Sequence, residues 1–123
     1  MSPFVTPLMN PTSGVSITPT LIFGNDTHTC FIDSILVTNT SNSTINIFVS
    51  VAREQTEGIE SYFSLAYKAQ LLAGTCIDIL QDKALTFEAG DLLYASCDSS
   101  GGSFDVFVVY RELSELPALS RGY

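Results

Sequence analysis

The chain contains a single histidine, His28, which lies next but one to Asp26 in a polar segment that follows Gly24. An imidazole close to a carboxylate can act as a general base or help to hold a metal ion. A metal site needs three or four ligands, and no other ligand is spaced to join this pair. We therefore interpret His28 as a polar residue at a turn, and we expect neither a metal nor a catalytic role.

Three acids, Glu54, Glu57 and Glu60, share one polar stretch with Gly58. Calcium binds in loops rich in oxygen ligands, so this stretch is a candidate for a calcium site. The spacing of the acids is not that of a calcium loop, and the residues between them are not consistently oxygen donors. The stretch Glu54–Glu60 is therefore predicted to be an exposed, solvated loop.

The three cysteines, Cys30, Cys76 and Cys97, are widely spaced and form no Cys-x-x-Cys pair. Each lies in an apolar, strand-like run, where a free thiol acts as a small hydrophobic residue. No Gly-x-Ser-x-Gly motif and no phosphate-binding glycine loop with a lysine is present. These patterns favour a protein that is not an enzyme, has no cofactor and has no metal.

Aromatic residues offer a binding alternative, because tyrosines can form a platform for sugars. The five tyrosines are Tyr62, Tyr67, Tyr94, Tyr110 and Tyr123. Most lie inside predicted strands, where a tyrosine is more often a core residue with its hydroxyl at the rim. A glycan-binding or host-surface-binding module is kept as the second hypothesis.

Charge excludes two classes of partner. The net charge is −8, and the five basic residues are scattered along the 123-residue chain. Nucleic acid and anionic membranes both require clustered basic residues, so neither is an expected partner. With only 15% charged residues, the surface is largely neutral and polar, which suits packing against other proteins.

Short apolar runs separated by turn signals cover most of the chain, and no useful helical period appears. A run of about eight such strands at intervals of roughly 8–12 residues is typical of a β-sandwich or barrel. We predict an all-β, single antiparallel sandwich with jelly-roll-like connectivity. Cys30–Thr40 and Ile45–Arg53 are expected to form a hairpin around the polar turn between them. The predicted divisions are an extended arm over 1–20, the sandwich over 21–113 and an irregular tail over 114–123.

The predicted arm holds four of the five prolines, which suit an extended segment better than a helix. It also carries Phe4, Val5, Leu8 and Met9, and these apolar residues need cover. An arm laid across its own domain or across a neighbouring subunit would give them that cover.

The last predicted strand, Phe104–Glu112, is apolar on both faces. Phe107 and Val109 point one way and Val106 and Val108 the other, because successive side chains of a strand alternate. One face can join the core, and the other needs a second layer or another protein. The predicted inter-subunit contacts are therefore made by two sets of residues. In the arm they are Phe4, Val5, Leu8 and Met9, and on the strand faces they are Phe48 and Phe107.

Several segments together resemble small virion proteins of tailed bacteriophages, over about two-thirds of the chain. They are the run Phe31-Ile-Asp-Ser-Ile-Leu-Val-Thr-Asn39, Val49, Tyr62-Phe-Ser-Leu65, Leu72-Ala-Gly74, Ala89-Gly-Asp-Leu92, and Val106, Val108, Tyr110 and Glu112. The Ala-Gly-Asp turn also occurs in unrelated jelly rolls, where Gly90 supplies an unusual backbone conformation and Asp91 bonds nearby backbone donors.

The resemblance implies a head decoration (cement) protein or a neck or tail accessory protein. It implies a β-sandwich that is assembled in the bacterial host cytoplasm and becomes part of the virion. The implied partners are other copies of the chain, with a trimer as one candidate, and virion proteins such as the major capsid or neck and tail proteins.

Overall fold

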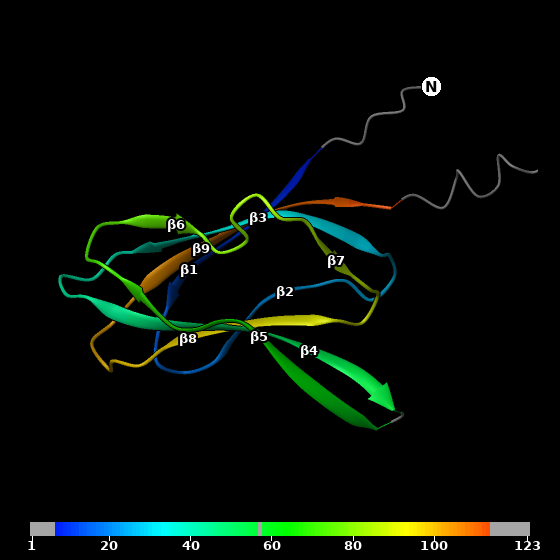
Figure 1. Cartoon of the computed structure of the whole chain (residues 1–123), viewed down its shortest axis with the longest axis horizontal. Helices are drawn as coiled ribbons and strands as arrows, with labels where there is room; N and C mark the ends of the chain where they lie inside the picture. The colour runs from blue at the N-terminus through cyan, green and yellow to red at the C-terminus, as the bar shows by residue number, and fades with distance from the viewer. Residues whose placement is uncertain (1–6, 57, 114–123) are drawn as a thin grey trace, which may run out of the picture.

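The computed structural model describes residues 7–56 and 58–113, apart from the side chains of residues 55 and 56, and these residues form nine strands and no helix. Figure 1 shows them as two stacked sheets. In chain order the strands are β1 (Leu8–Val15), β2 (Thr20–Gly24), β3 (Cys30–Asn39), β4 (Ile45–Thr56), β5 (Ile59–Leu71), β6 (Cys76–Asp78), β7 (Leu85–Phe87), β8 (Leu92–Cys97) and β9 (Phe104–Glu112).

The strand order confirms the predicted antiparallel, jelly-roll-like sandwich. One sheet has the order β1-β9-β3-β6, with β7 also paired to β3, and the other has the order β2-β8-β4-β5. The strands pair from the two ends of the chain inwards: β1 with β9, β2 with β8, β3 with β6 and β7, and β4 with β5. The chain therefore forms one long antiparallel ribbon that is rolled up into the two sheets. The further pairs β3–β9 and β4–β8 close the roll.

The core lies between the two sheets and follows the alternation of the strands. In β9 the fully buried residues are Phe104, Val106 and Val108, while Phe107 and Val109 lie on the outer face and are half-buried. The two-faced character predicted for this strand is therefore present in the structure. Within the described residues no helix could cross a membrane.

The predicted hairpin of Cys30–Thr40 with Ile45–Arg53 is wrong. The strands β3 and β4 do not form a hairpin, because they lie in different sheets, and the side chain of Asn39 instead organises the connection. Its Nδ2 donates to the carbonyl oxygens of Ser43 and Leu71 at 2.8 and 2.9 Å, and its Oδ1 accepts from Ser41. Alternation marks where strands lie but carries no information on which strands pair.

The stretch Glu54–Glu60 is not a loop. Strand β4 continues to Thr56 and β5 begins at Ile59, with Thr56 and Ile59 paired across the turn. Polar residues are tolerated in these strands because this end of the hairpin lies outside the core, so a hydrophobic pattern is not required there.

The predicted boundary between arm and sandwich at residue 20 stays a prediction, although Leu8–Val15 already forms β1 and pairs with β9. Pro11 is accepted there because β1 is the outer strand of its sheet. The first part of the arm and the tail over 114–123 lie outside the described residues.

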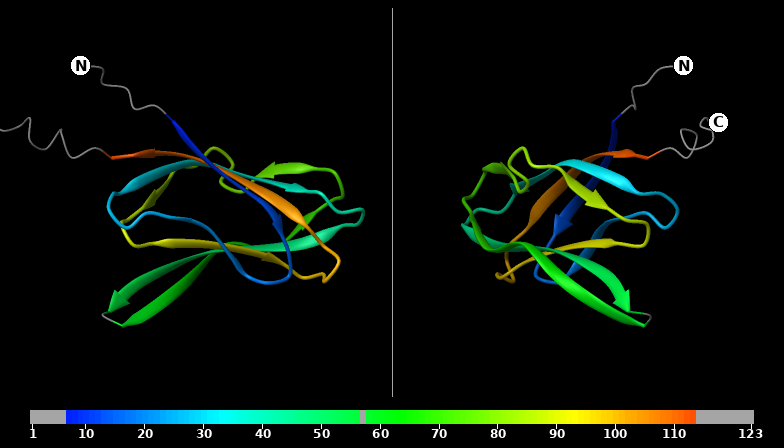
Figure 2. Two further views of the ribbon diagram at one scale, coloured as in Figure 1. Left: turned by 180° about the vertical axis from the view of Figure 1, so that it is seen from behind. Right: turned by 45° about the vertical axis from the view of Figure 1, so that its right-hand side comes forward.

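The far end of the β4–β5 hairpin extends beyond the sandwich. Both views in Figure 2 show it diverging from the two layers as a two-stranded ribbon. From Arg53 onward β4 pairs only with β5, because β8 begins at Leu92 opposite Ala52. This part of the hairpin, Arg53–Thr56 with Ile59–Ser61, is called the projecting ribbon below.

Candidate interaction surface

Strand β5 is the outermost strand of its sheet and is exposed along most of its 13 residues. Several of its large apolar and aromatic side chains are open to solvent: Ile59 (59%), Tyr62 (64%), Phe63 (45%) and Tyr67 (69%). Strand β4 is its one strand neighbour in the described part of the chain. The strand therefore offers exposed apolar side chains together with a backbone edge that can pair with a further strand.

Two irregularities divide β5. Ala66 pairs with Val49 and Ser64 with Ser50, which leaves Leu65 as an extra residue, and a second shift follows between Val49 and Ile47. Lys68 lies at this second shift with a φ of 54°, a backbone conformation that residues other than glycine rarely adopt. The regular part of the β5 edge is therefore Ile59–Ser64.

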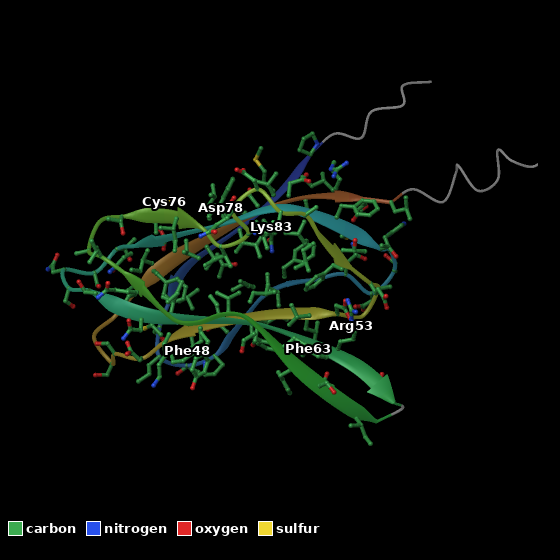
Figure 3. The ribbon with its side chains drawn as sticks, viewed as in Figure 1. Phe48, Arg53, Phe63, Cys76, Asp78 and Lys83 are labelled. Atoms are coloured by element: carbon green, nitrogen blue, oxygen red, sulfur yellow. The ribbon has the colours of Figure 1, made fainter. Side chains whose placement is uncertain are left out.

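An ion pair fixes the base of the projecting ribbon to the sandwich. Figure 3 labels its arginine, Arg53. Arg53 of β4 donates from Nε and Nη2 to both carboxylate oxygens of Asp91, at 2.6 to 3.1 Å. Asp91 is 2% exposed and also accepts from the Glu88 backbone at 2.8 Å, and Gly90 beside it has a φ of 95°. Hydrogen bonding to the Asp91 carboxylate raises the pKa of Arg53 above its ordinary value.

The outer face of the β2-β8-β4-β5 sheet is aromatic. Figure 3 shows Phe48 on this side, and its ring makes an edge contact with Tyr67 at 5.4 Å between centroids. Tyr94 lies on the same face opposite Ser50, and Tyr62 lies there opposite the buried Ala52. The interpretation of the tyrosines as core residues is therefore wrong for Tyr62 and Tyr67.

The outer face of the other sheet carries a smaller apolar row. Phe107 lies between Pro11 of β1 and Leu36 of β3, and Met9 lies opposite Val109. Met9 is 61% exposed, whereas Phe107 is half-buried. This face is a second candidate contact surface.

The predicted contact residues do not form one site. Met9 and Phe107 lie on the outer face of the β1-β9-β3-β6 sheet, and Phe48 lies on that of the opposite sheet. Leu8 is paired with Tyr110 near the start of β1 and is 38% exposed. Phe4 and Val5 lie outside the described residues. All six remain predictions as contact residues.

The histidine and the acidic residues that were considered for catalysis or metal binding make local hydrogen bonds. Nδ1 of His28 lies 2.8 Å from the Thr27 hydroxyl, and Asn25 accepts from the backbone of His28. Glu54 accepts from the Gly58 backbone and Glu60 from the Tyr62 hydroxyl, while Glu57 lies outside the described residues. Across residues 7–56 and 58–113, no three His, Cys, Asp or Glu side chains are grouped so that they could hold a metal ion.

The cysteines do not all share one environment. Cys30 and Cys97 are buried, and burial raises the pKa of the Cys30 thiol. Cys76 is exposed on β6, so the interpretation of it as a small core hydrophobe is wrong. The strand that carries it has three residues at the outer edge of its sheet, where burial is incomplete.

The sequence interpretation missed the projecting ribbon and placed Phe63, Leu65 and Tyr67 on one face. The structure packs Leu65 against the core, while Tyr67 contacts Phe48 on the outer face. The signal that was available is the combination of adjacent aromatic residues, Tyr62 and Phe63, with no polar residue between them. Such a pair places aromatic groups on both faces of a strand.

No protein-family profile matches the sequence, and no curated protein is significantly similar to it. Among solved structures, the chain is similar to the structure of the infectious bursal disease virus Gx strain, with 14% identity and a TM-score of 0.37 over 97% of this chain and 42% of that one. It is also similar to the VP2 subviral particle of infectious bursal disease virus, with 10% identity and a TM-score of 0.33 over 95% and 44%. The chain spans less than half of either neighbour, and with identities and TM-scores this low neither match bears on function.

Proposed function

We propose that the protein is a non-enzymatic structural subunit of a tailed-phage virion, either a decoration (cement) protein or a neck or tail accessory protein. It would act through contacts with its own copies, with a trimer as one candidate, and with virion proteins such as the major capsid or neck and tail proteins. The virion assignment rests on the sequence resemblance, and the mode of action rests on the surfaces described above.

One observation carries the mode of action. The sandwich has a complete core of its own, yet Ile59, Tyr62, Phe63 and Tyr67 of a single strand are 45 to 69% exposed. Exposed apolar patches on a soluble domain commonly mark interaction sites. Because a rigid β-sandwich presents such patches in a fixed arrangement, weak contacts can add up when many copies assemble.

The test is the presence of the protein in purified particles. Phage particles banded on a density gradient are analysed by quantitative mass spectrometry, and antibody labelling in negative stain locates the protein. A fixed ratio to the major capsid protein supports the proposal. Absence of the protein from particles of a phage whose genome encodes it overturns the proposal.

Phe107→Asp tests the predicted contact on the other sheet. The variant is expected to fold, because Val106 and Val108 still fill the core face of β9, and to be depleted from particles. Thr86→Asp, at an exposed position of β7, is the matched control and should enter particles normally. Normal incorporation of Phe107→Asp would remove Phe107 from the contact surface.

A glycan-binding module of a fibre or tail is the second candidate, favoured by the exposed aromatic face. Tyr62 and Tyr67 are 64% and 69% exposed, and Phe48 supports the Tyr67 ring from the side. Rings exposed on a flat sheet can stack on sugars. A glycan array probed at high protein concentration tests this, and an array without hits would retire the candidate.

A further inference from the structure

The projecting ribbon lacks the support that an isolated two-stranded ribbon needs. Two-stranded hairpins are marginally stable in water, and a third strand or a packed face is normally required. Beyond Ala52 the ribbon has no third strand in the part of the chain that the structure describes, and Ile59 near its tip is 59% exposed. The next residues of β5, Tyr62 and Phe63, have β8 beyond β4, yet they are still 64% and 45% exposed. A further strand along β5 would supply this support.

The free edge of β5 is not protected in the ways that edge strands usually are. Proline, inward charges and short length all block pairing between chains. Over Ile59–Ser64 there is no proline, and Glu60 is the only charged residue. The one register shift in the pairing of this segment, between Glu54 and Thr56, places its extra residue in β4 and not in β5. In a chain with a net charge of −8, this is a segment along which two copies can approach with little repulsion.

We propose that β5 pairs in antiparallel fashion with β5 of a second copy, about a two-fold axis that places Tyr62 opposite Tyr62. The inference deepens the proposed function, since it names the partner and the strand through which a structural subunit would associate with itself. The two hairpins then form one four-stranded sheet that joins the two sandwiches.

Charge selects this register over its neighbours. With Tyr62 at the axis, each Glu60 lies opposite Ser64 of the other copy, whose hydroxyl can donate to the carboxylate. The two Glu60 side chains are then about 13 Å apart along the strand, which exceeds a Debye length of about 8 Å at physiological salt. The aromatic pair at the centre is itself favourable, because aromatic side chains directly opposite each other stabilise antiparallel strands.

The alternative registers are less favourable. An axis at Ser61 makes the two Glu60 residues diagonal neighbours, and each already faces Glu54 of its own chain, so four carboxylates would gather. An axis at Glu60 would place like charges directly opposite each other. An axis at Phe63 or Ser64 requires pairing across Leu65, where β5 departs from a regular strand.

Disulfide trapping tests the register directly. Cys76 is exposed, so the background is Cys76→Ser, while Cys30 and Cys97 are buried. In this background Tyr62→Cys should form a covalent dimer under mild oxidation, because residues directly opposite in antiparallel strands have Cβ atoms about 4.5–5.5 Å apart. Ser61→Cys should cross-link more slowly, because it lies opposite Phe63 of the other copy.

Tyr67→Cys is the matched control for chemical accessibility. Tyr67 is an equally exposed tyrosine of β5, but it lies beyond the irregularity at Leu65. Cross-linking of Tyr67→Cys as fast as that of Tyr62→Cys would overturn the proposal, as would faster cross-linking of Ser61→Cys. Circular dichroism of each reduced variant checks that the fold is retained.

Light scattering of the unmodified protein completes the test. A dimer is expected, and Tyr62→Lys, which places a charge at the axis, should weaken dimerisation about tenfold or more. A protein that is monomeric at every concentration overturns the inference, and so does a Tyr62→Cys variant that cross-links only to a different virion protein. Either result leaves the virion role open to the particle assay, while a dimer that is absent from particles would overturn the virion role alone.

Discussion

Strands β1 and β5 lie at the outer edges of the two sheets, but their free edges differ. The β1 edge carries Pro11, which lacks a backbone donor, and the pairing of β1 with β9 is interrupted between Thr12 and Val15. Asn10 also donates to the carbonyl oxygen of Ile22 at 2.6 Å, which ties β1 to β2 of the opposite sheet. The β5 edge has no proline over Ile59–Ser64 and, among the described residues, makes no side-chain hydrogen bond to the opposite sheet, so we expect a further strand to pair there and not along β1.

The largest expected effect comes from removing the anchor of the projecting ribbon. Asp91→Ala leaves Arg53 and the Glu88 backbone without their acceptor. Removing one partner of a buried ion pair costs about 3–5 kcal/mol, and we expect about 2–3 kcal/mol here because Arg53 is 33% exposed. Urea unfolding measures the loss.

The matched control is Asp33→Ala, which breaks the exposed pair with Arg111, whose side chains are 35% and 40% exposed. A much smaller loss is expected, because exposed ion pairs contribute little. Equal losses for the two variants would contradict the view that the ribbon is fixed by a buried anchor.

A medium loss of stability is expected from straining the backbone at Gly14 in β1. Gly14 has a φ of 70°, and nothing lies within 4 Å of a Cβ built there, so Gly14→Ala is strained by its backbone alone. The expected cost is about 1–2 kcal/mol, measured by thermal or urea unfolding. Gly101→Ala is the control, because Gly101 also has open space but no positive φ, and it should change stability by less than about 0.5 kcal/mol. A similar loss in both variants would mean that the turn in β1 is not conformationally specific.

The smallest loss of stability is expected for a substitution at Asp98, at the opposite end of the sandwich from the tip of the projecting ribbon. Asp98 accepts from the Asn46 side chain and backbone at 2.9 and 3.0 Å, and these bonds lower its pKa below the ordinary value of 3.8. A carboxyl group with a lowered folded pKa stabilises the fold above its unfolded pKa and loses that contribution as the pH falls through the folded pKa. Asp98→Asn should therefore lose slight stability at neutral pH, and the difference from the parent should vanish in acid. A difference that persists in acid would contradict this assignment.

Much of the fold could be predicted from alternation in the chain. The strand bounds near Phe104–Glu112 and Leu92–Cys97 follow from apolar residues at every second position, and the Gly90 and Asp91 turn has the predicted geometry. The pairing of β3 with β9, and not with β4, could not be predicted, since it joins segments far apart in the chain.

The candidate surface was harder to predict. The irregularities at Leu65 and Lys68 reverse the direction of the following side chains, and Lys68 gives no sign of a positive φ as a glycine would. The ends of β4 and β5 near Glu54 and Glu60 could not be recognised as strands, because that part of the hairpin lies outside the core and lacks alternating apolar residues. Strand residues that do not pack in the core need not alternate between apolar and polar, and this alternation is the signal by which a strand is recognised in a sequence.

Amide hydrogen exchange, followed as a function of protein concentration, tests the central claim most directly. The segments to compare are Ile59–Ser64 of β5 and Leu8–Ser13 of β1, within one sample and under identical conditions. We predict that protection of the β5 amides increases with concentration while that of the β1 amides stays constant. If the β5 amides exchange at the same rate at every concentration, the open edge is not a self-association surface and the account is contradicted.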